Sequence, residues 1–338
     1  MANQIKHQSK WTPGLGVIIF VITMLWLVLG STFVTFKLGS WGQIVLELVL
    51  LAIAVLPALI NKTPLKELFP IKKISVRDFF GSSLMWLGAL LLGYISIFAV
   101  SIFLPQGLAD DVNGLEARVS SSIAALAFIG MVIMPPVCEE ALTRGTMLTC
   151  FRGIKKDWVI ILIIACIFGA MHCDATRFLN TAIFGAVTAY IMLKRENILL
   201  GMMIHFFQNF LCVGISLIGG ALASPADIEE AGEAVDAMSA LDVTAYSTFT
   251  LGIFMIIGFL APVMIAVGAH IIKRQAEIDA NVAPKGMKLW IKLIISGVLA
   301  ASLFIGGIAV LVTASSNGDA GSFITVENNA AVQADIDG

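Results

Sequence analysis

The stretch that decides the fold is 123–144, IAALAFIGMVIMPPVCEEALTR. In it, a long apolar run ends in two adjacent carboxylates, Glu139 and Glu140, and in Arg144. Ionisable side chains are costly at membrane depth, so their presence at the end of such a run calls for a structural or functional reason. The stretch therefore predicts a membrane helix that carries a polar site.

The composition of the whole chain also indicates a membrane protein. Of its 338 residues, 58% are apolar and only 13% are charged, and the mean hydropathy is +0.94. About a quarter of the residues of a soluble domain are charged, so this composition excludes an ordinary soluble domain. The five cysteines lie in or beside apolar runs without a CxxC spacing, so we expect free thiols. The predicted fold class is all-α, a polytopic bundle of transmembrane helices.

Apolar runs along the chain predict about nine transmembrane helices. The first run is longer than the apolar core of a signal peptide and is interpreted as a helix. The fifth and sixth are short, and Cys173-Asp174-Ala175 between them predicts a tight helical hairpin. The runs are, in chain order, 12–36, 41–60, 79–104, 122–144, 158–173, 176–193, 198–220, 248–272 and 290–314.

Lysines and arginines are distributed unevenly among the segments between these runs. Most of them lie in the amino-terminal tail and in the segments 61–78, 145–157, 194–197 and 273–292, which all fall on one side of the membrane. Because basic residues favour the cytoplasmic side, we expect a cytoplasmic amino terminus and an outer carboxyl terminus. The expected location is the cell membrane.

The same pattern divides the chain into four parts. A core of four helices is preceded by three helices with a basic loop, and followed by an acidic outer loop, two more helices and a polar tail that we expect to be disordered. The four parts are 1–121, 122–220 for the core, 221–314 and 315–338.

Few ionisable side chains remain within the predicted helices. Glu47 stands alone in the second helix and is interpreted as a packed, protonated or snorkelling group, and His270 as an interface residue. At about 1.5 Å per residue, the remaining groups of the core helices lie about 12–21 Å from the cytoplasmic surface. Independent structural histidines have no reason to share this depth. The groups that share it are Glu139, His172, His205 and the amide Asn209, and Glu140 and Arg144 lie beside Glu139.

Helical spacing separates the two carboxylates of the first motif. Glu140 and Arg144 are four residues apart and face each other, so each can neutralise the other. Glu139 is rotated by about 100° and is left as the free carboxylate. Pro135-Pro136 remove two backbone donors just before it, which predicts free carbonyls, a kink and a wet pocket. A simpler alternative stays open, in which the Glu–Arg pair only locks helices and a histidine only forms an interhelical hydrogen bond.

A carboxylate, two imidazoles and a carboxamide suit hydrolysis by an activated water. The carboxylate can act as general base, and His and Asn side chains can donate to an oxyanion. Other hydrolase plans fit less well, because the chain has no HExxH helix, no Asp within the predicted helices and no Ser in a GxS turn opposite a histidine. The set also suits a proton relay, so a proton-coupled transporter is one alternative, and a non-catalytic immunity or scaffold protein is another.

The chain contains three motifs in the order Glu139-Glu140-x-x-x-Arg144, Phe168-x-x-x-His172 and His205-x-x-x-Asn209. These motifs and their order resemble those of the CAAX-protease and bacteriocin-processing family, also called the CPBP or Abi family. The resemblance covers roughly 120–215. It implies an intramembrane endopeptidase whose Glu139 activates water with the help of His172. It further implies that His205 and Asn209 hold the oxyanion, while Glu140, Arg144 and Phe168 support the site.

The resemblance also sets the expected cofactors and partners. Members of the family are labelled both as metalloproteases and as glutamate proteases, and Glu139, His172, His205 and Asn209 could together hold Zn²⁺. Since Asn is an uncommon zinc ligand, we favour catalysis without a cofactor. The expected substrate is a membrane-associated or lipid-modified protein or a leader peptide, with the lipid bilayer as surroundings and no nucleic acid.

Overall fold

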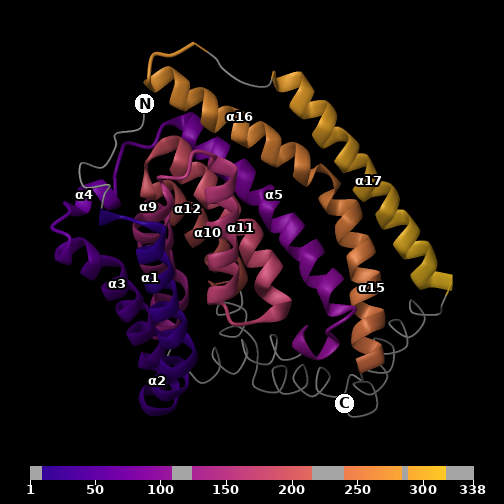
Figure 1. Ribbon diagram of the computed structural model, residues 1–338. Coiled ribbons are helices and arrows are strands. Elements are labelled where there is room, and N and C mark those ends of the chain that lie inside the picture. Colours follow the sequence, from indigo (N-terminus) through magenta and orange to yellow (C-terminus); the bar gives the residue numbers. More distant parts are fainter. Residues whose placement is uncertain (1–9, 109–123, 215–239, 284–287, 317–338) are drawn as a thin grey trace.

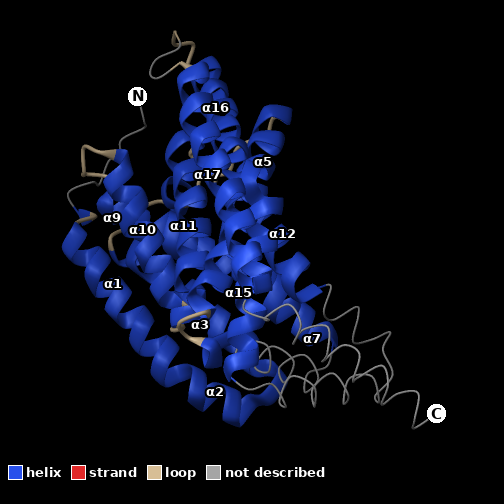
Figure 2. Ribbon diagram, turned by 90° about the vertical axis from the view of Figure 1, so that its right-hand side faces the viewer, coloured by secondary structure: helices blue, strands red, loops and turns tan. Residues whose placement is uncertain are grey.

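The computed structural model describes residues 10–108, 124–214, 240–283 and 288–316. Within these ranges every regular element is a helix, as Figure 2 shows. The predicted all-α fold is confirmed for this part of the chain. The acidic segment 224–242 and the tail 315–338 fall almost wholly outside the described residues, and the orientation of the termini stays a prediction.

The first part of the chain forms the helices up to α5. Their bounds are α1 Pro13–Leu25, η2 Trp26–Gly30, α2 Ser31–Leu38, η3 Gly39–Trp41, α3 Gly42–Ile60, α4 Leu65–Leu68 and α5 Val76–Ser101.

The central part begins with one continuous helix that contains two π-helical stretches, η4 and η5, and continues with three further helices. The bounds are α7 Ala124–Phe128, η4 Ile129–Ile133, α8 Met134–Glu140, η5 Ala141–Met147, α9 Leu148–Phe151, α10 Asp157–Met171, α11 Ala175–Arg195, α12 Ile198–Asn209 and η6 Phe210–Gly214. The last part consists of α15 Ala240–Ile257, η7 Gly258–Leu260, α16 Ala261–Asp279 and α17 Leu289–Ser316.

The central helices lie between two outer groups (Figure 1). Helices α1 to α3, in indigo, lie on one side, and α15 to α17, in orange and yellow, lie on the other. Helix α3 packs against α8 and η5, while α5 packs against α11, α15 and α16. The helices of the predicted core are therefore enclosed on both sides.

Seven helices of the described residues are long and apolar enough to cross a membrane, and two shorter apolar helices, Asp157–Met171 and Ile198–Gly214, accompany them. The fifth predicted helix is short, as expected, but the sixth is not, since α11 has 21 residues. The prediction ended that helix at 193 because Lys194 and Arg195 are charged, yet both are good helix formers. The seven spans are Pro13–Gly30, Gly42–Ile60, Val76–Ser101, Ala125–Phe151, Ala175–Arg195, Val243–Asp279 and Leu289–Ser316.

The inner spans are more buried than the outer ones. The buried share is 50% for Ala125–Phe151 and 56% for Ala175–Arg195, but only 17% for α17. Exposed apolar side chains such as Val298 and Ile305 cover the outer face of α17, which suits contact with lipid tails. Polar side chains of the central helices are thereby kept away from lipid.

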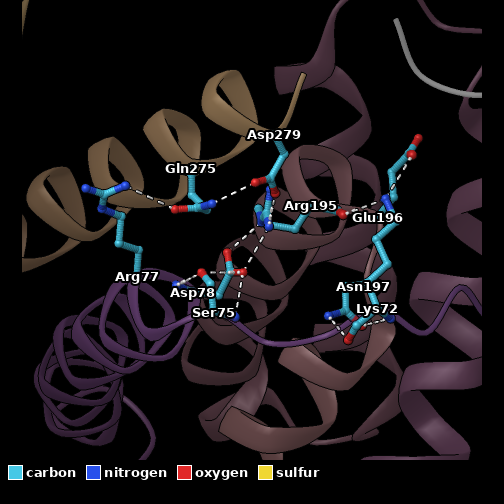
Figure 3. A network of polar contacts seen from close by, with 9 residues as sticks. All are labelled: Lys72, Ser75, Arg77, Asp78, Arg195, Glu196, Asn197, Gln275 and Asp279. Carbon is cyan, nitrogen blue, oxygen red and sulfur yellow. Dashed lines mark hydrogen bonds and ion pairs between the residues drawn. The ribbon is translucent and has the colours of Figure 1, made fainter. Parts of the chain in front are cut away.

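A network of charged side chains joins three helices at the end of α11 (Figure 3). Arg195 lies between Asp78 of α5 and Asp279 of α16, with N–O distances of 2.5 Å to Asp78 and 2.6 Å to Asp279. Gln275 donates to Asp279 over 2.7 Å, and the fully buried Asp78 forms the capping box of α5 with Ser75. We call Asp78, Arg195 and Asp279 the Arg195 clasp. It fixes α11 against α5 and α16.

The start of α12 is fixed beside this clasp. Glu196 has a left-handed conformation with φ 48°, which turns the chain from α11 into α12. The Asn197 side chain accepts from the Lys72 backbone N–H over 3.1 Å and donates to the Lys72 carbonyl over 2.9 Å. It also accepts from the N–H of Leu199 as the cap of α12. The helix that carries His205 and Asn209 therefore begins at a defined point.

Candidate active site

The site is built around Pro135-Pro136, which remove two backbone donors from the continuous helix of the central part. Proline has no N–H, so Pro135 cannot donate to the carbonyl of Met131 four residues earlier. In the structure this carbonyl accepts a hydrogen bond of 3.0 Å from the Asn209 amide of α12. The π-helical stretches η4 and η5 flank the prolines, and such stretches are frequent at functional sites. The Met131 carbonyl is thus the free carbonyl that the prolines predicted, and its hydrogen bond joins α12 to the helix that contains Pro135 and Pro136.

Glu140 and Arg144 form the predicted pair. Arg144 Nη1 lies 3.0 Å from Glu140 Oε1, and the two side chains are 1% and 0% exposed. Arg144 also donates to the hydroxyl of Thr188 on α11 and to the carbonyl of Gly185. A Cβ added at Gly201 of α12 would collide with the Glu140 carboxylate. This buried pair is held from several sides, as a buried ion pair must be to remain favourable.

Glu139 has very different surroundings. Its side chain is 15% exposed, and its Oε2 lies 3.9 Å from His205 Nε2 without forming a hydrogen bond in the described part of the chain. His205 Nδ1 lies 3.2 Å from Glu140 Oε1. An ionised carboxylate only accepts, so the hydrogen sits on Nδ1, and Nε2 faces Glu139. His205 therefore links the buried carboxylate to the accessible one.

His172 joins the site through Phe168. The His172 Nδ1 lies 2.9 Å from the Phe168 carbonyl, and a carbonyl only accepts, so Nε2 is left without a hydrogen in the neutral ring. The Phe168 ring lies 5.1 Å from the His172 ring and 5.8 Å from the His205 ring. The Arg144 guanidinium lies over the same ring at 4.3 Å. Phe168 thus holds an arginine and two histidines around one buried ring.

The structure brings the predicted residues together to different degrees. Glu139, Glu140, Arg144, Phe168 and His205 are in contact or nearly so, and His172 reaches them through Phe168. Asn209 lies one helical turn after His205 and directs its amide at Met131, where one Nδ2 hydrogen is used.

Two further residues near the site were not predicted to belong to it. Glu47 is 2% exposed and accepts a 3.0 Å hydrogen bond from Gln43, and its carboxyl interacts electrostatically with Glu139. It is therefore a packed group, not a snorkelling one, and it does not stand alone. Arg177 in the first turn of α11 also acts electrostatically on Glu139. Both residues lie on other helices than Glu139, so no helical spacing along the chain predicts that they are near it, and only the tertiary structure shows this.

The four residues considered as zinc ligands do not form a ligand set in this arrangement. Among the described residues, no group of three or more His, Cys, Asp or Glu side chains is placed to hold a metal ion. The Nδ1 atoms of His172 and His205 both have oxygen partners, an arrangement that metal-binding histidines also show, whereas the Asn209 amide is turned to a backbone carbonyl.

Comparison with known proteins points to the same segment. Residues 121–211 match a family model described as Type II CAAX prenyl endopeptidase Rce1-like. The resemblance to the CAAX-protease family is confirmed. The match contains all three motifs and most of the predicted core 122–220. Together with the seven apolar spans, it supports a multi-pass membrane protein and an intramembrane protease of the CAAX type.

A protein of Escherichia coli, named as an uncharacterized 24.3 kDa protein, is similar to part of the chain. The two are 28% identical over 126 residues, which are 36% of this chain and 58% of the E. coli protein. The match thus spans less than two thirds of that relative. No solved structure matched the chain.

Proposed function

We propose that this protein is an intramembrane endopeptidase that hydrolyses a peptide bond of a membrane-associated or lipid-modified protein with a water activated by Glu139. One observation carries the proposal: of two adjacent carboxylates, Glu140 is fully buried and paired with Arg144, whereas the Glu139 side chain is 15% exposed and has no arginine or lysine partner among the described residues. A general base must be reachable by the water that it deprotonates. Glu139 meets this condition and Glu140 does not.

In the proposed reaction, Glu139 accepts a proton from water as the hydroxide oxygen bonds to the scissile carbonyl carbon. The carbonyl oxygen becomes an oxyanion, which accepts hydrogen bonds from protonated His205 Nε2 and from the second Nδ2 hydrogen of Asn209. The Nε2 of His172 accepts a hydrogen bond from the same water and orients it. When the C–N bond breaks, the proton passes from Glu139 to the leaving amine.

Glu140 supports this cycle through His205. Its carboxylate accepts from Nδ1 over 3.2 Å and so orients the imidazole ring. Arg144 pairs with Glu140 from the other side and holds that carboxylate in place. No step of this cycle requires a metal.

The test compares membranes of cells that express the wild type or the Glu139→Gln variant, with neo-amino termini identified by mass spectrometry. We expect new termini in membrane proteins with the wild type and their loss with the variant, at equal protein levels. Identical sets of termini in both samples would show that Glu139 is not the catalytic base.

A further inference from the structure

Arg177 lies at the α10–α11 hairpin, five residues after His172. The Asp174 carboxylate begins α11 by accepting from the backbone N–H groups of Thr176 and Arg177 over 2.7 and 3.1 Å. The Thr176 hydroxyl lies against Gly107, and the Asn180 amide lies against Gly93 of α5. Thr176 and Asn180 are four residues apart and share the face of α11 that meets α5. Arg177 is rotated by about 100° from Thr176, onto a different face.

The charge of Arg177 reaches groups on three other elements of the site. It interacts electrostatically with Glu139 at the end of α8, with His172 at the end of α10 and with Cys212 in η6. Arg177 is partly exposed, as Glu139 is. The Arg177 side chain is therefore within electrostatic range of the proposed catalytic carboxylate, in the first turn of the helix that follows His172.

This guanidinium has no anionic partner within residues 10–108, 124–214, 240–283 and 288–316. None of its nitrogen atoms forms a hydrogen bond or an ion pair there, and the nearest acidic residue in sequence, Asp174, uses Oδ1 for the helix cap. The contrast with Arg144 and Arg195 is clear, since each of those contacts a carboxylate at 3.0 Å or less. A guanidinium beside an active site is well suited to bind a carboxylate with two parallel hydrogen bonds.

We propose that Arg177 binds a carboxylate of the substrate and is a specificity-determining residue of this site. The inference rests on the proposed peptidase function and adds the chemical class that the site selects: peptides with a carboxylate close to the scissile bond. Such a carboxylate comes from the peptide's carboxyl terminus or from an Asp or Glu side chain, and the two sources have the same chemistry at Arg177.

A purely electrostatic effect on Glu139 would give a different result. If Arg177 only stabilised the ionised form of Glu139, its loss would affect all substrates equally. If it binds a carboxylate, its loss affects only peptides that carry one. Peptides that differ in this one group therefore separate the two roles.

The test uses the purified full-length protein in detergent micelles and fluorescent peptides with the same apolar segment. One peptide has a free terminal carboxylate, one is amidated, one is amidated and has an internal Asp, and one is amidated with Asn in its place. Binding is measured by fluorescence anisotropy for the wild type, Arg177→Gln, Arg177→Lys and Arg274→Gln. Arg274 is the matched control, because it is an exposed arginine of α16 that pairs with Glu277.

We expect Arg177→Gln to weaken binding of one of the carboxylate peptides about 10- to 100-fold and to leave its uncharged counterpart unchanged. Arg177→Lys should retain part of the affinity, and Arg274→Gln should behave as the wild type. Whether the terminal or the internal carboxylate responds identifies the source. Equal effects on charged and uncharged peptides, or no preference of the wild type for either carboxylate, would overturn the proposal.

The binding measurement also separates this proposal from the peptidase function. Cleavage of the same peptides is followed in parallel with wild type and Glu139→Gln. Selective binding without Glu139-dependent cleavage would contradict the proposed function while leaving the carboxylate site in place. Glu139-dependent cleavage that is insensitive to Arg177 for every peptide would contradict the carboxylate site alone.

Discussion

The Arg195 clasp and the Glu139–His205 site are two polar clusters between helices, and they differ in how completely their charges are paired. In the clasp, one arginine contacts two carboxylates at 2.5 and 2.6 Å, and these contacts join three helices. In the site, Arg144 is paired with the fully buried Glu140, while the side chain of the neighbouring Glu139 is 15% exposed and its buried Oε2 forms no hydrogen bond with the described residues. Each charged member of the clasp has an oppositely charged partner, whereas Glu139 has no arginine or lysine partner among the described residues. The two clusters therefore differ in whether every carboxylate has a cationic partner of this kind.

Glu139→Gln should have the largest effect on activity and little effect on stability. The amide keeps the size of the side chain but cannot accept a proton from water, so cleavage should fall at least about 100-fold. Activity and thermal unfolding of the purified variant are measured together. Glu140→Gln is measured as the comparison. If Glu139→Gln lowers the unfolding temperature as much as Glu140→Gln does, the two carboxylates do not have separate roles.

Arg144→Met should have the largest effect on stability. It leaves Glu140 as an unpaired buried charge, which costs about 3–5 kcal/mol of unfolding free energy. The double variant Arg144→Met with Glu140→Gln removes that charge and should recover part of the loss. Thermal or denaturant unfolding in micelles measures both, and a double variant as unstable as the single one would argue against the buried pair.

Asp78→Asn tests the clasp. It should lower the free energy of unfolding by about 2 kcal/mol, because it removes a charge-assisted contact while Asp279 still pairs with Arg195. Cleavage per folded molecule should stay close to that of the wild type at a temperature below the unfolding transition. A large loss of activity in folded Asp78→Asn would show that the clasp contributes directly to the reaction.

Asn197→Ala should have a smaller effect. It should lower the free energy of unfolding by about 1 kcal/mol, because the cap of α12 and the contacts with Lys72 are lost. A matched control is Asn61→Ala, since Asn61 ends α3 without a side-chain hydrogen bond among the described residues. Unfolding of both variants is compared under the same conditions, and equal stability would show that the Asn197 contacts contribute nothing.

Metal removal should have the smallest effect of these changes and should leave the rate of cleavage as it is. The proposed cycle uses only protein groups, so incubation with a strong zinc chelator should leave cleavage unchanged. The protein is assayed before and after chelation, and again after addition of Zn²⁺. Activity that disappears with the chelator and returns with zinc would replace the proposed cycle with a metal-dependent one.

Much of this organisation could be predicted from the sequence. Hydropathy located the apolar helices of the described residues, and the four-residue spacing of Glu140 and Arg144 predicted their pairing, because helix geometry is local. The absent N–H of Pro135 predicted a free backbone carbonyl for the same reason. The end of α11 was misplaced at 193, since charge alone does not end a helix whose last arginine has carboxylate partners on other helices.

What the sequence determined by itself was therefore the all-α membrane fold, the three motifs and the pairing of Glu140, not Glu139, with Arg144. The tertiary structure alone decided which groups from distant segments surround them. Asn209 lies at the Met131 carbonyl, and Glu47 and Arg177 lie within electrostatic range of Glu139. These contacts join residues from different helices, and their distances depend on how the helices pack, which no local spacing in the chain encodes.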